Sequence, residues 1–391
     1  MTIDNVGDSL TALSDYRELT TSNARTLPPE LYVSKELYEL EIDAIWSKNW
    51  ICVAHEAELQ NPGDFVGLEL IGEPIALIRG HDGVIRALSS VCRHRFMPIV
   101  EQGDGGNTAH LRCPYHRWTY STDGRLEAAA YMERNECFAM DEIALPDFRV
   151  EVWHGFVFVN LDDGAAPLAP QMSGLDAHFR RNRLVEDCSD WVLVDRYDKV
   201  WDCNWKASTE NSLESYHHMG VHRGTIENYA PTRSVEDSIE YGDRYSYYQI
   251  PYDMKTESAQ RMVEQSGWVP GDMGMGVPML EISFTPPTTA FTVSPDSFGY
   301  YTMWPISHDR TRVYCGVFAR PRASGELRPA SSEFGSNFLE QVMDEDGTAM
   351  PGVQRSLASR KVEAGALSWL EEPILRWYQW LGRQMHDPAT D

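Results

Sequence analysis

The sequence predicts an α+β protein in which a small antiparallel β domain precedes a larger domain of antiparallel sheet and helices. Short apolar runs separated by Gly and Asp-Gly turns fill the first part of the chain, as antiparallel strands require. Four more strand-like runs and a helical stripe of apolar residues lie in the second half. With 391 residues, 42% of them apolar, the chain is long enough for two or three domains with substantial cores.

The β domain is expected over residues 46–163. Asp82-Gly83 and Asp123-Gly124 are two of its turn signals. Its candidate strands are Phe65–Leu70, Ile75–Arg79, Val84–Leu88 and Phe156–Asn160. The segment 1–45, with a helix expected near 35–46, is predicted to pack on the second domain and not on the β domain.

The second domain is expected over residues 164–391, after a Gly- and Pro-containing linker. A helix-rich segment is predicted as far as Tyr229, and residues 229–278 are interpreted as a loop or lid because they show little periodicity. The predicted strands are Met279–Phe284, Thr289–Val293, Gly299–Trp304 and Thr311–Ala319. The apolar stripe of the final helix, predicted to be core, consists of Leu367, Leu370, Ile374, Trp377 and Leu381.

Composition excludes some classes of partner. The formal net charge is −25, so the surface should repel phosphates and nucleic acid is excluded as a partner. No apolar run is long enough to span a bilayer and no signal peptide is recognisable, so we expect a cytoplasmic protein without a membrane anchor. Five cysteines at unrelated spacings are predicted to be structural thiols, not a disulfide framework: Cys52, Cys137, Cys188, Cys203 and Cys315.

The two remaining cysteines belong to a paired motif that carries chemistry. Cys92-Arg93-His94 and Cys113-Pro114-Tyr115-His116 are separated by eighteen residues, and each contributes one thiolate and one imidazole. Two Cys and two His ligands are the set that holds a Rieske-type [2Fe-2S] cluster, in which the histidines raise the reduction potential. Zinc uses the same residue types, but Cys₂His₂ zinc sites place two cysteines together and two histidines together. The mixed loops therefore favour the cluster.

These residues resemble the Rieske domain of Rieske non-haem iron oxygenases. The resemblance rests on C-R-H-R, on C-P-Y-H-R-W, on Tyr120 and on the glycine of Asp123-Gly124. It departs from the family at Phe96, where glycine is common. The resemblance implies that Cys92, His94, Cys113 and His116 hold one cluster per chain.

A second motif combines Glu214, His217 and His222. His217 and His222 are five residues apart, which on a regular helix is about 140° of rotation, so the helix must be distorted or end near Gly220 for both to face one ion. Two histidines and one carboxylate form the facial triad of non-haem Fe(II) oxygenases. The alternative is a solvated helix, but an electron-carrying cluster upstream needs an acceptor for its electrons.

The second motif resembles the family's catalytic segment, N-W-K-x₃-E-N-x₂-[D/E]-x-Y-H-x₄-H. The resemblance implies that His217 and His222 ligate one Fe(II) per chain. It places Glu214 as the acidic bridge between a cluster histidine of one subunit and an iron ligand of its neighbour. The third ligand is expected at Asp346, because the acidic run from 343 to 347 resembles the family's E-D-x₇-Q segment. Asp344 is the alternative, and a solvated helix start is the other interpretation of that run.

As a whole the chain is identified as a member of the terminal oxygenase (alpha) subunits of ring-hydroxylating oxygenases. The resemblance implies a Rieske domain joined to a helix-grip catalytic domain in a homotrimer. Electrons would come from NAD(P)H through a reductase, with or without a ferredoxin, since the chain has no NAD or flavin motif. The Fe(II) would then activate O₂ to hydroxylate or demethylate a small organic substrate, such as an aromatic compound in catabolism or a quaternary amine.

Other interpretations stay open at this point. A Rieske-type electron carrier with a non-catalytic binding domain would hold about two irons per chain instead of three, and a zinc regulatory protein would be colourless. Substrate identity, monooxygenase or dioxygenase chemistry and the need for a beta subunit are also open. Four arginines beside the ligand loops suggest a docking site for an acidic electron donor, unless local carboxylates neutralise them: Arg93, Arg95, Arg112 and Arg117.

Overall fold

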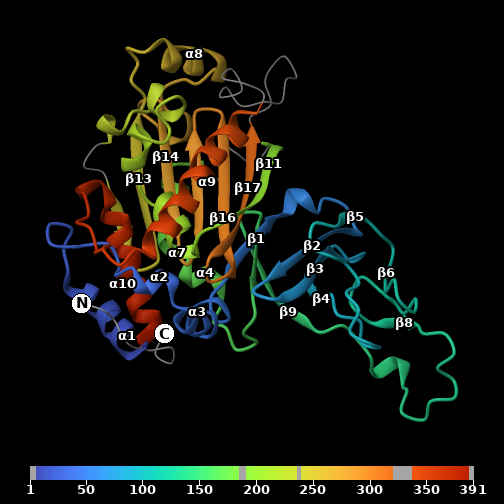
Figure 1. Ribbon diagram of the computed structural model, residues 1–391. Helices are drawn as coiled ribbons and strands as arrows, with labels where there is room; N and C mark the ends of the chain where they lie inside the picture. Colours follow the sequence, from blue (N-terminus) through green and yellow to red (C-terminus); the bar gives the residue numbers. More distant parts are fainter. Residues whose placement is uncertain (1–5, 185–190, 236–238, 320–336, 387–391) are drawn as a thin grey trace. The chain divides into compact units, whose positions relative to one another are not determined.

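The computed structural model describes residues 6–184, 191–235, 239–319 and 337–386 (Figure 1). The chain separates into two compact units. One spans Trp46–Leu168, and the other combines the segments before Trp46 and after Leu168. Within the described ranges, no helix has the length and apolar character needed to cross a membrane. Cys188 lies outside those ranges, and the six cysteines inside them are free thiols.

The unit 46–168 is built from antiparallel strands. Its larger sheet has the order β1-β10-β9-β4-β3-β2-β5, and a smaller one has the order β6-β7-β8. The strands are β1 Ile51–His55, β2 Asp64–Leu70, β3 Glu73–Arg79, β4 Ile85–Ser89, β5 Gly105–Asn107, β6 Leu111–Arg112, β7 Thr119–Tyr120, β8 Leu126–Ala128, β9 Asp147–Trp153 and β10 Phe156–Asn160. The four predicted strands are confirmed, and the remaining six are too short or too irregular in pattern to be recognised from the sequence.

The other unit contains a seven-stranded antiparallel sheet of order β11-β17-β16-β15-β14-β13-β12. Its strands are β11 Val192–Trp201, β12 Glu240–Gly242, β13 Tyr245–Pro251, β14 Met279–Thr285, β15 Thr289–Ser294, β16 Ser297–Ser307 and β17 Arg310–Ala319. The four consecutive strands β14 to β17 are confirmed. They pair as successive hairpins, with Tyr301 opposite Cys315 in β16 and β17.

The segment before Tyr229 is helix-rich as predicted, but it also contains β11, an edge strand paired only with β17. The charged residues of β11 hide its strand pattern. The prediction for the following segment is wrong. The predicted loop or lid of residues 229–278 contains β12, β13 and a helix, α8 Glu257–Ser266. The signal of β13 was missed because tyrosines and polar residues occupy both faces of the strand, so its burial depends on what packs over each face.

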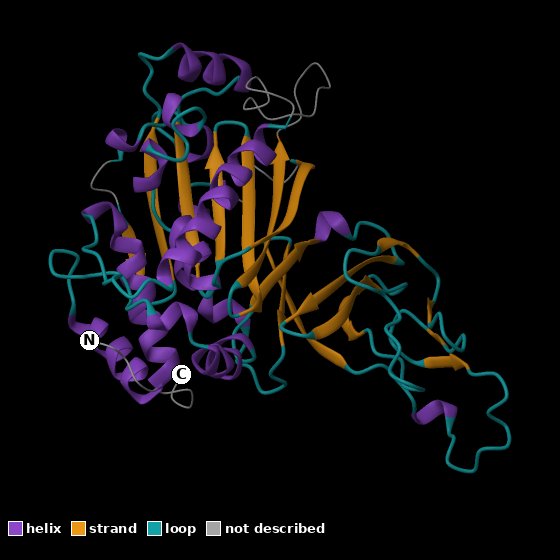
Figure 2. Cartoon of the chain, viewed as in Figure 1, coloured by secondary structure: helices purple, strands orange, loops and turns teal. Residues whose placement is uncertain are grey.

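Helices lie against one face of the seven-stranded sheet, and Figure 2 shows the long helix α9 running across that face. The helices of the chain are α1 Val6–Asp15, α2 Glu30–Val33, α3 Lys35–Glu41, α4 Leu168–Gln171, α5 Ser173–Arg181, α7 Trp205–Ser212, α8, α9 Phe338–Leu357 and α10 Glu372–His386. The predicted stripe of the final helix is core as expected, because Ile374, Trp377 and Leu381 are buried in α10 and Leu367 and Leu370 are buried just before it.

A buried ion pair joins α3 to α7. Lys206 Nζ lies 2.6 Å from Glu41 Oε1, and both side chains are 2% exposed. The Trp205 indole N–H donates to the other oxygen of Glu41 at 2.7 Å. One turn further along α7, Glu210 accepts a hydrogen bond from the Tyr32 hydroxyl, and burial raises its pKa to about 7. These contacts hold the start of α7, and therefore the segment that follows it, in a fixed position.

Removal of one partner of this pair should destabilise the unit strongly. In Glu41→Gln, Lys206 would stay buried without its counter-charge, and we expect a loss of about 3–5 kcal/mol in the free energy of unfolding, measured by urea titration. Glu257→Gln is the control, because its partner Arg261 is 54% exposed and the glutamate 81% exposed. The control should show no measurable change. Equal effects of the two substitutions would contradict the assignment.

Candidate functional site

The two loops of the first motif share one backbone geometry. In each loop the cysteine N–H donates to the carbonyl five residues later, and the cysteine carbonyl accepts from the N–H four residues later. The bonds are Cys92 N to Met97 O, 3.0 Å, Phe96 N to Cys92 O, 3.1 Å, Cys113 N to Trp118 O, 2.9 Å, and Arg117 N to Cys113 O, 3.1 Å. The loops therefore place their cysteines in equivalent backbone positions, whereas the histidine is two residues after the cysteine in the first loop and three in the second.

Phe96, the departure from the family pattern, occupies a left-handed position at φ 61°. Arg117 has the same conformation at the equivalent point of the second loop, φ 64°. Glycine adopts this region without a steric penalty, which explains its use in relatives. The Phe96 side chain is 82% exposed, so the substitution changes the surface of the loop and not its internal packing.

The four predicted cluster ligands lie together. Cys92 and Cys113 are buried, and the rings of His94 and His116 are 4.6 Å apart. The Nδ1 atoms of both histidines are buried, and neither has a hydrogen-bond partner in the described structure. Buried imidazole nitrogens without partners are costly unless a ligand binds them. Burial, His116 and Arg95 also lower the pKa of His94, which favours the neutral form that binds metals. The residues present fit a [2Fe-2S] cluster.

Tyr120 contacts the sulfur of one candidate ligand. Its hydroxyl lies 3.3 Å from Cys92 Sγ and accepts the Arg93 N–H at 3.1 Å. Because the hydroxyl oxygen already accepts one bond, its own hydrogen is available to the sulfur. A donor to a cluster sulfur stabilises the reduced, more negative state.

The arginine collar, defined as Arg93, Arg95, Arg112 and Arg117, is exposed around these loops. In the part of the chain that the structure describes, no carboxylate lies within ion-pair distance of any of the four. Arg95 instead stacks over the Tyr115 ring at 5.2 Å. The interpretation in which local carboxylates neutralise the collar therefore finds no support.

The second motif begins on a helix that ends before its histidines. The Asn204 side chain caps α7 by accepting from Lys206 N at 2.9 Å. The helix stops at Ser212, and a short 3-10 helix, η5 Tyr216–Met219, carries His217. Gly220 follows directly. The predicted interruption of the helix is confirmed, although it starts earlier than Gly220.

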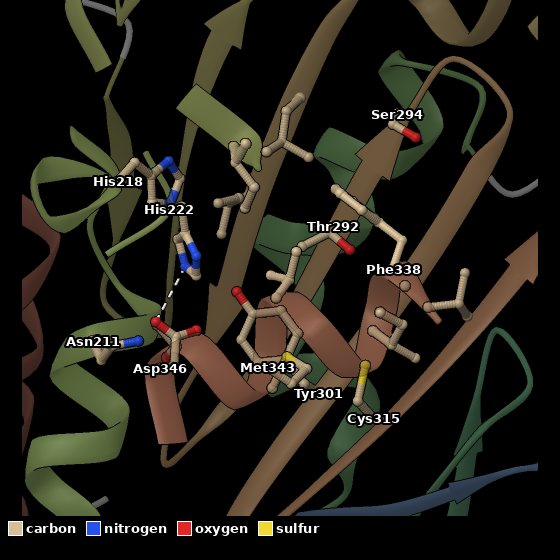
Figure 3. Close-up of a pocket in the computed structure, with 18 of the residues that line it drawn as sticks. Asn211, His218, His222, Thr292, Ser294, Tyr301, Cys315, Phe338, Met343 and Asp346 are labelled. Carbon is tan, nitrogen blue, oxygen red and sulfur yellow. Dashed lines mark ion pairs between the residues drawn. The ribbon is translucent and has the colours of Figure 1, made fainter. Parts of the chain in front are cut away.

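His217, His222 and Asp346 converge at the wall of a cavity. His222 Nε2 is 3.1 Å and His217 Nε2 is 3.6 Å from Asp346 Oδ1. Figure 3 shows His222 facing Asp346, which comes from α9. Ligand atoms about 2.1 Å from one ion and at right angles to each other lie about 3 Å apart, so these three side chains fit one metal ion. Asp346 Oδ1 is buried and makes no hydrogen bond within the described ranges.

A carboxylate holds the other nitrogen of each histidine. His217 Nδ1 lies 2.7 Å from Glu214 Oε1, and His222 Nδ1 lies 2.8 Å from Glu345 Oε2. Thr225 Oγ1 also donates to Glu345 at 2.7 Å. Protonated Nδ1 atoms leave both Nε2 lone pairs directed to the Asp346 side. Sequence reasoning missed Glu345, although its position directly before Asp346 was the available signal.

Asp344 and His218 are the other candidates near this set. Asp344 bonds Lys199 Nζ at 2.8 Å and the Tyr197 hydroxyl at 3.0 Å. His218 is buried and can offer a ring nitrogen within 4.8 Å of those of His217 and His222. Burial lowers its pKa well below the usual value. Asp346 lies closer to the two histidines than this limit and supplies negative charge, so it is the better third ligand.

The cavity beside this set has a volume of about 320 Å³. One face of the sheet, α9 and the segment after α7 form its wall (Figure 3). Apolar side chains dominate the lining, among them Ile226, Leu280, Ile282, Met303, Val313, Val317, Phe338, Leu339, Val342 and Met343. The hydroxyl of Tyr301 and the carboxylate of Asp195 are polar exceptions. Such a cavity suits a small organic molecule and excludes most water.

Known proteins resemble both halves of this chain. Residues 49–145 match the model of the Rieske [2Fe-2S] domain, and residues 188–387 match that of the ring hydroxylating alpha subunit (catalytic domain). The carnitine monooxygenase oxygenase subunit of Acinetobacter pittii is 30% identical over 86% of each chain. Benzene 1,2-dioxygenase subunit alpha of Pseudomonas putida is 28% identical over 53% of this chain and 46% of its own.

A solved structure of a quaternary ammonium Rieske monooxygenase superposes with a TM-score of 0.78 and 26% identity, over 94% of this chain and 97% of the other. Fold and ligand sets together define the class of Rieske-type oxygenases. Within it, the chain belongs to the ring hydroxylating alpha subunit family. It is therefore a terminal oxygenase, an oxidoreductase with a [2Fe-2S] Rieske domain and a mononuclear-iron catalytic domain. It needs a reductase, O₂ and a small organic substrate.

Tyr120→Phe should lower the reduction potential of the cluster. Loss of the hydroxyl removes one hydrogen bond to Cys92 Sγ, and we expect a decrease of about 50 mV, measured by redox titration of the visible spectrum. Tyr115→Phe is the control, because that exposed hydroxyl makes no described bond to either cysteine. An unchanged potential in Tyr120→Phe would show that the hydroxyl does not donate to the sulfur.

Proposed function

We propose that Cys92, His94, Cys113 and His116 hold the cluster and that His217, His222 and Asp346 hold the Fe(II) of this oxygenase. The approach of both Nε2 atoms to one buried oxygen of Asp346, at 3.1 and 3.6 Å, carries the proposal. An electron carrier with a non-catalytic second domain has no need for this arrangement. When bound, ferrous iron with three protein ligands supplies open positions for O₂ activation.

The protein's own residues prepare this reaction. Glu214 and Glu345 accept the Nδ1 protons of the two histidines, which fixes the orientation of both rings and leaves Nε2 as the atom that can bind a metal. The apolar wall keeps the substrate next to Asp346 and limits water. The reaction we propose is hydroxylation or demethylation of a small organic molecule, aromatic or quaternary amine, the two classes in the names of the relatives.

Electron delivery involves partners. In our proposal a reductase that uses NAD(P)H, alone or through a ferredoxin, docks near the cluster loops. The exposed arginine collar supports an acidic donor, because complementary charge speeds encounter. We also propose a homotrimer in which Glu214 links the cluster of one subunit to the iron of the next. The Glu214 carboxylate lies 2.7 Å from His217 Nδ1, so it is next to a proposed iron ligand, as the bridging role requires.

Asp346→Ala should remove the mononuclear iron and leave the cluster intact. We expect total iron to fall from about three to about two per chain, with an unchanged visible spectrum and no product. Asp344→Ala, at the neighbouring acid that pairs with Lys199, should keep three irons and activity. Iron analysis and absorption spectra check both variants. Retained mononuclear iron in Asp346→Ala, or its loss in Asp344→Ala, would show that Asp344 and not Asp346 is the third iron ligand.

Glu214→Gln should separate electron transfer from metal binding. We expect all irons to remain, while the rate at which O₂ and substrate reoxidise the reduced cluster falls at least about a hundredfold, because the bridge loses its charge. Stopped-flow absorbance in a single turnover measures this rate. Glu214→Asp keeps the carboxylate and should recover part of the rate. A wild-type rate in Glu214→Gln would rule out the bridging role.

A further inference from the structure

The cavity has two ends that differ in chemistry. Figure 3 shows Asp346, Tyr301 and Cys315 in succession along its wall. Tyr301 and Cys315 lie opposite each other on neighbouring strands β16 and β17, and β11 lies on the other side of β17. Two strand spacings, roughly 10 Å, therefore separate β11 from β16. Trp201, at the end of β11, lines the cavity and packs against Gly347, the neighbour of Asp346, whereas Asp195 is six residues earlier on the strand, roughly 20 Å along it.

Asp195 lies at the end of the cavity remote from Trp201. It lies opposite Val317 next to a bulge in β11 and lines the cavity. Burial and the charge of Asp195 both raise the pKa of the Cys315 thiol, which places the carboxylate near the Cys315 end. Asp195 Oδ1 accepts the N–H of its own neighbour, Arg196, at 2.8 Å. Among the described residues, no cation forms an ion pair with it.

The surroundings of Asp195 favour a positive ligand. Burial, and to a smaller extent the charge of Glu340, raise the pKa of the Asp195 carboxyl, because both disfavour its charged form. A half-buried carboxylate beside an apolar wall is stabilised when a cation binds to it. A positively charged group would therefore be stabilised at the Asp195 end of the cavity.

We propose that Asp195 determines specificity by binding the positive end of an organic cation, whose oxidised carbon lies at the other end of the cavity beside His222 and Asp346. This inference rests on the proposed iron site. It defines the substrate class as an elongated, mostly apolar molecule with an ammonium group at the end remote from the reacting carbon. The ammonium group would be a recognition element and would not itself be attacked.

A pair of matched probes tests the inference without turnover. The 4-methoxyphenethylammonium ion and 4-propylanisole have the same number of heavy atoms and differ in a terminal ammonium or methyl group. Equilibrium dialysis of the anaerobic holoenzyme should show at least about tenfold tighter binding of the ammonium probe. In Asp195→Asn and in Asp195→Ser that preference should disappear, with binding of 4-propylanisole unchanged within about twofold.

Glu340→Gln is the matched control. Glu340 is close to Asp195, but its carboxylate pairs with Lys199 and does not line the cavity. The preference for the ammonium probe should therefore persist in this variant. Equal binding of the two probes by the wild-type protein, or no binding of either, would overturn the role of Asp195. So would a preference that survives in Asp195→Asn. Failure to consume O₂ with any substrate would instead contradict the proposed function. The ratio of the affinities for the two probes is measured without turnover and does not depend on that result.

Discussion

Two carboxylate–imidazole bonds are the constraint on which the catalytic unit depends. Glu214 and Glu345 each hold one histidine by Nδ1, and this leaves both Nε2 atoms directed to Asp346. Without these bonds each ring could rotate or change tautomer, and the three ligand atoms would not converge. The two carboxylates come from different elements, so the geometry forms only when α9 packs across the sheet beside the segment that follows α7.

In the unit 46–168, two loops with the same backbone hydrogen-bond pattern bring four side chains together. Two loops of equal backbone geometry each supply one cysteine and one histidine, and the small sheet β6-β7-β8 supports the second loop. Left-handed residues at Phe96 and Arg117 close the loops, at a local conformational cost. The backbone of each loop thus fixes the position of its cysteine, and the Tyr120 hydroxyl contacts the sulfur of Cys92. Exposed arginines outside this centre leave its surface open to an acidic partner.

The cavity connects metal chemistry to substrate choice. Its apolar wall belongs to the sheet face under α9, and its two polar ends are built by residues distant in sequence. Asp346 is fixed by the metal set, whereas Asp195 has no such partner in the described structure. Relatives that act on uncharged rings and relatives that act on charged amines share the fold, so differences in specificity should arise from side chains such as Asp195 and not from the metal ligands.

The sequence by itself predicted the Cys-His and Glu-His motifs and determined strands β14 to β17, because each depends on local spacing or alternation. Tertiary structure decided the rest. Asp344 and Asp346 are two residues apart, about 200° around a helix, so only one can face the cavity, and the packing of α9 selects Asp346. Strand β11 is hidden in the sequence by charged residues that are largely exposed at the sheet edge, and β13 by tyrosines and polar residues that long-range packing buries. Glu345 and Asp195 acquire their roles only through contacts with elements far along the chain, which no local pattern encodes.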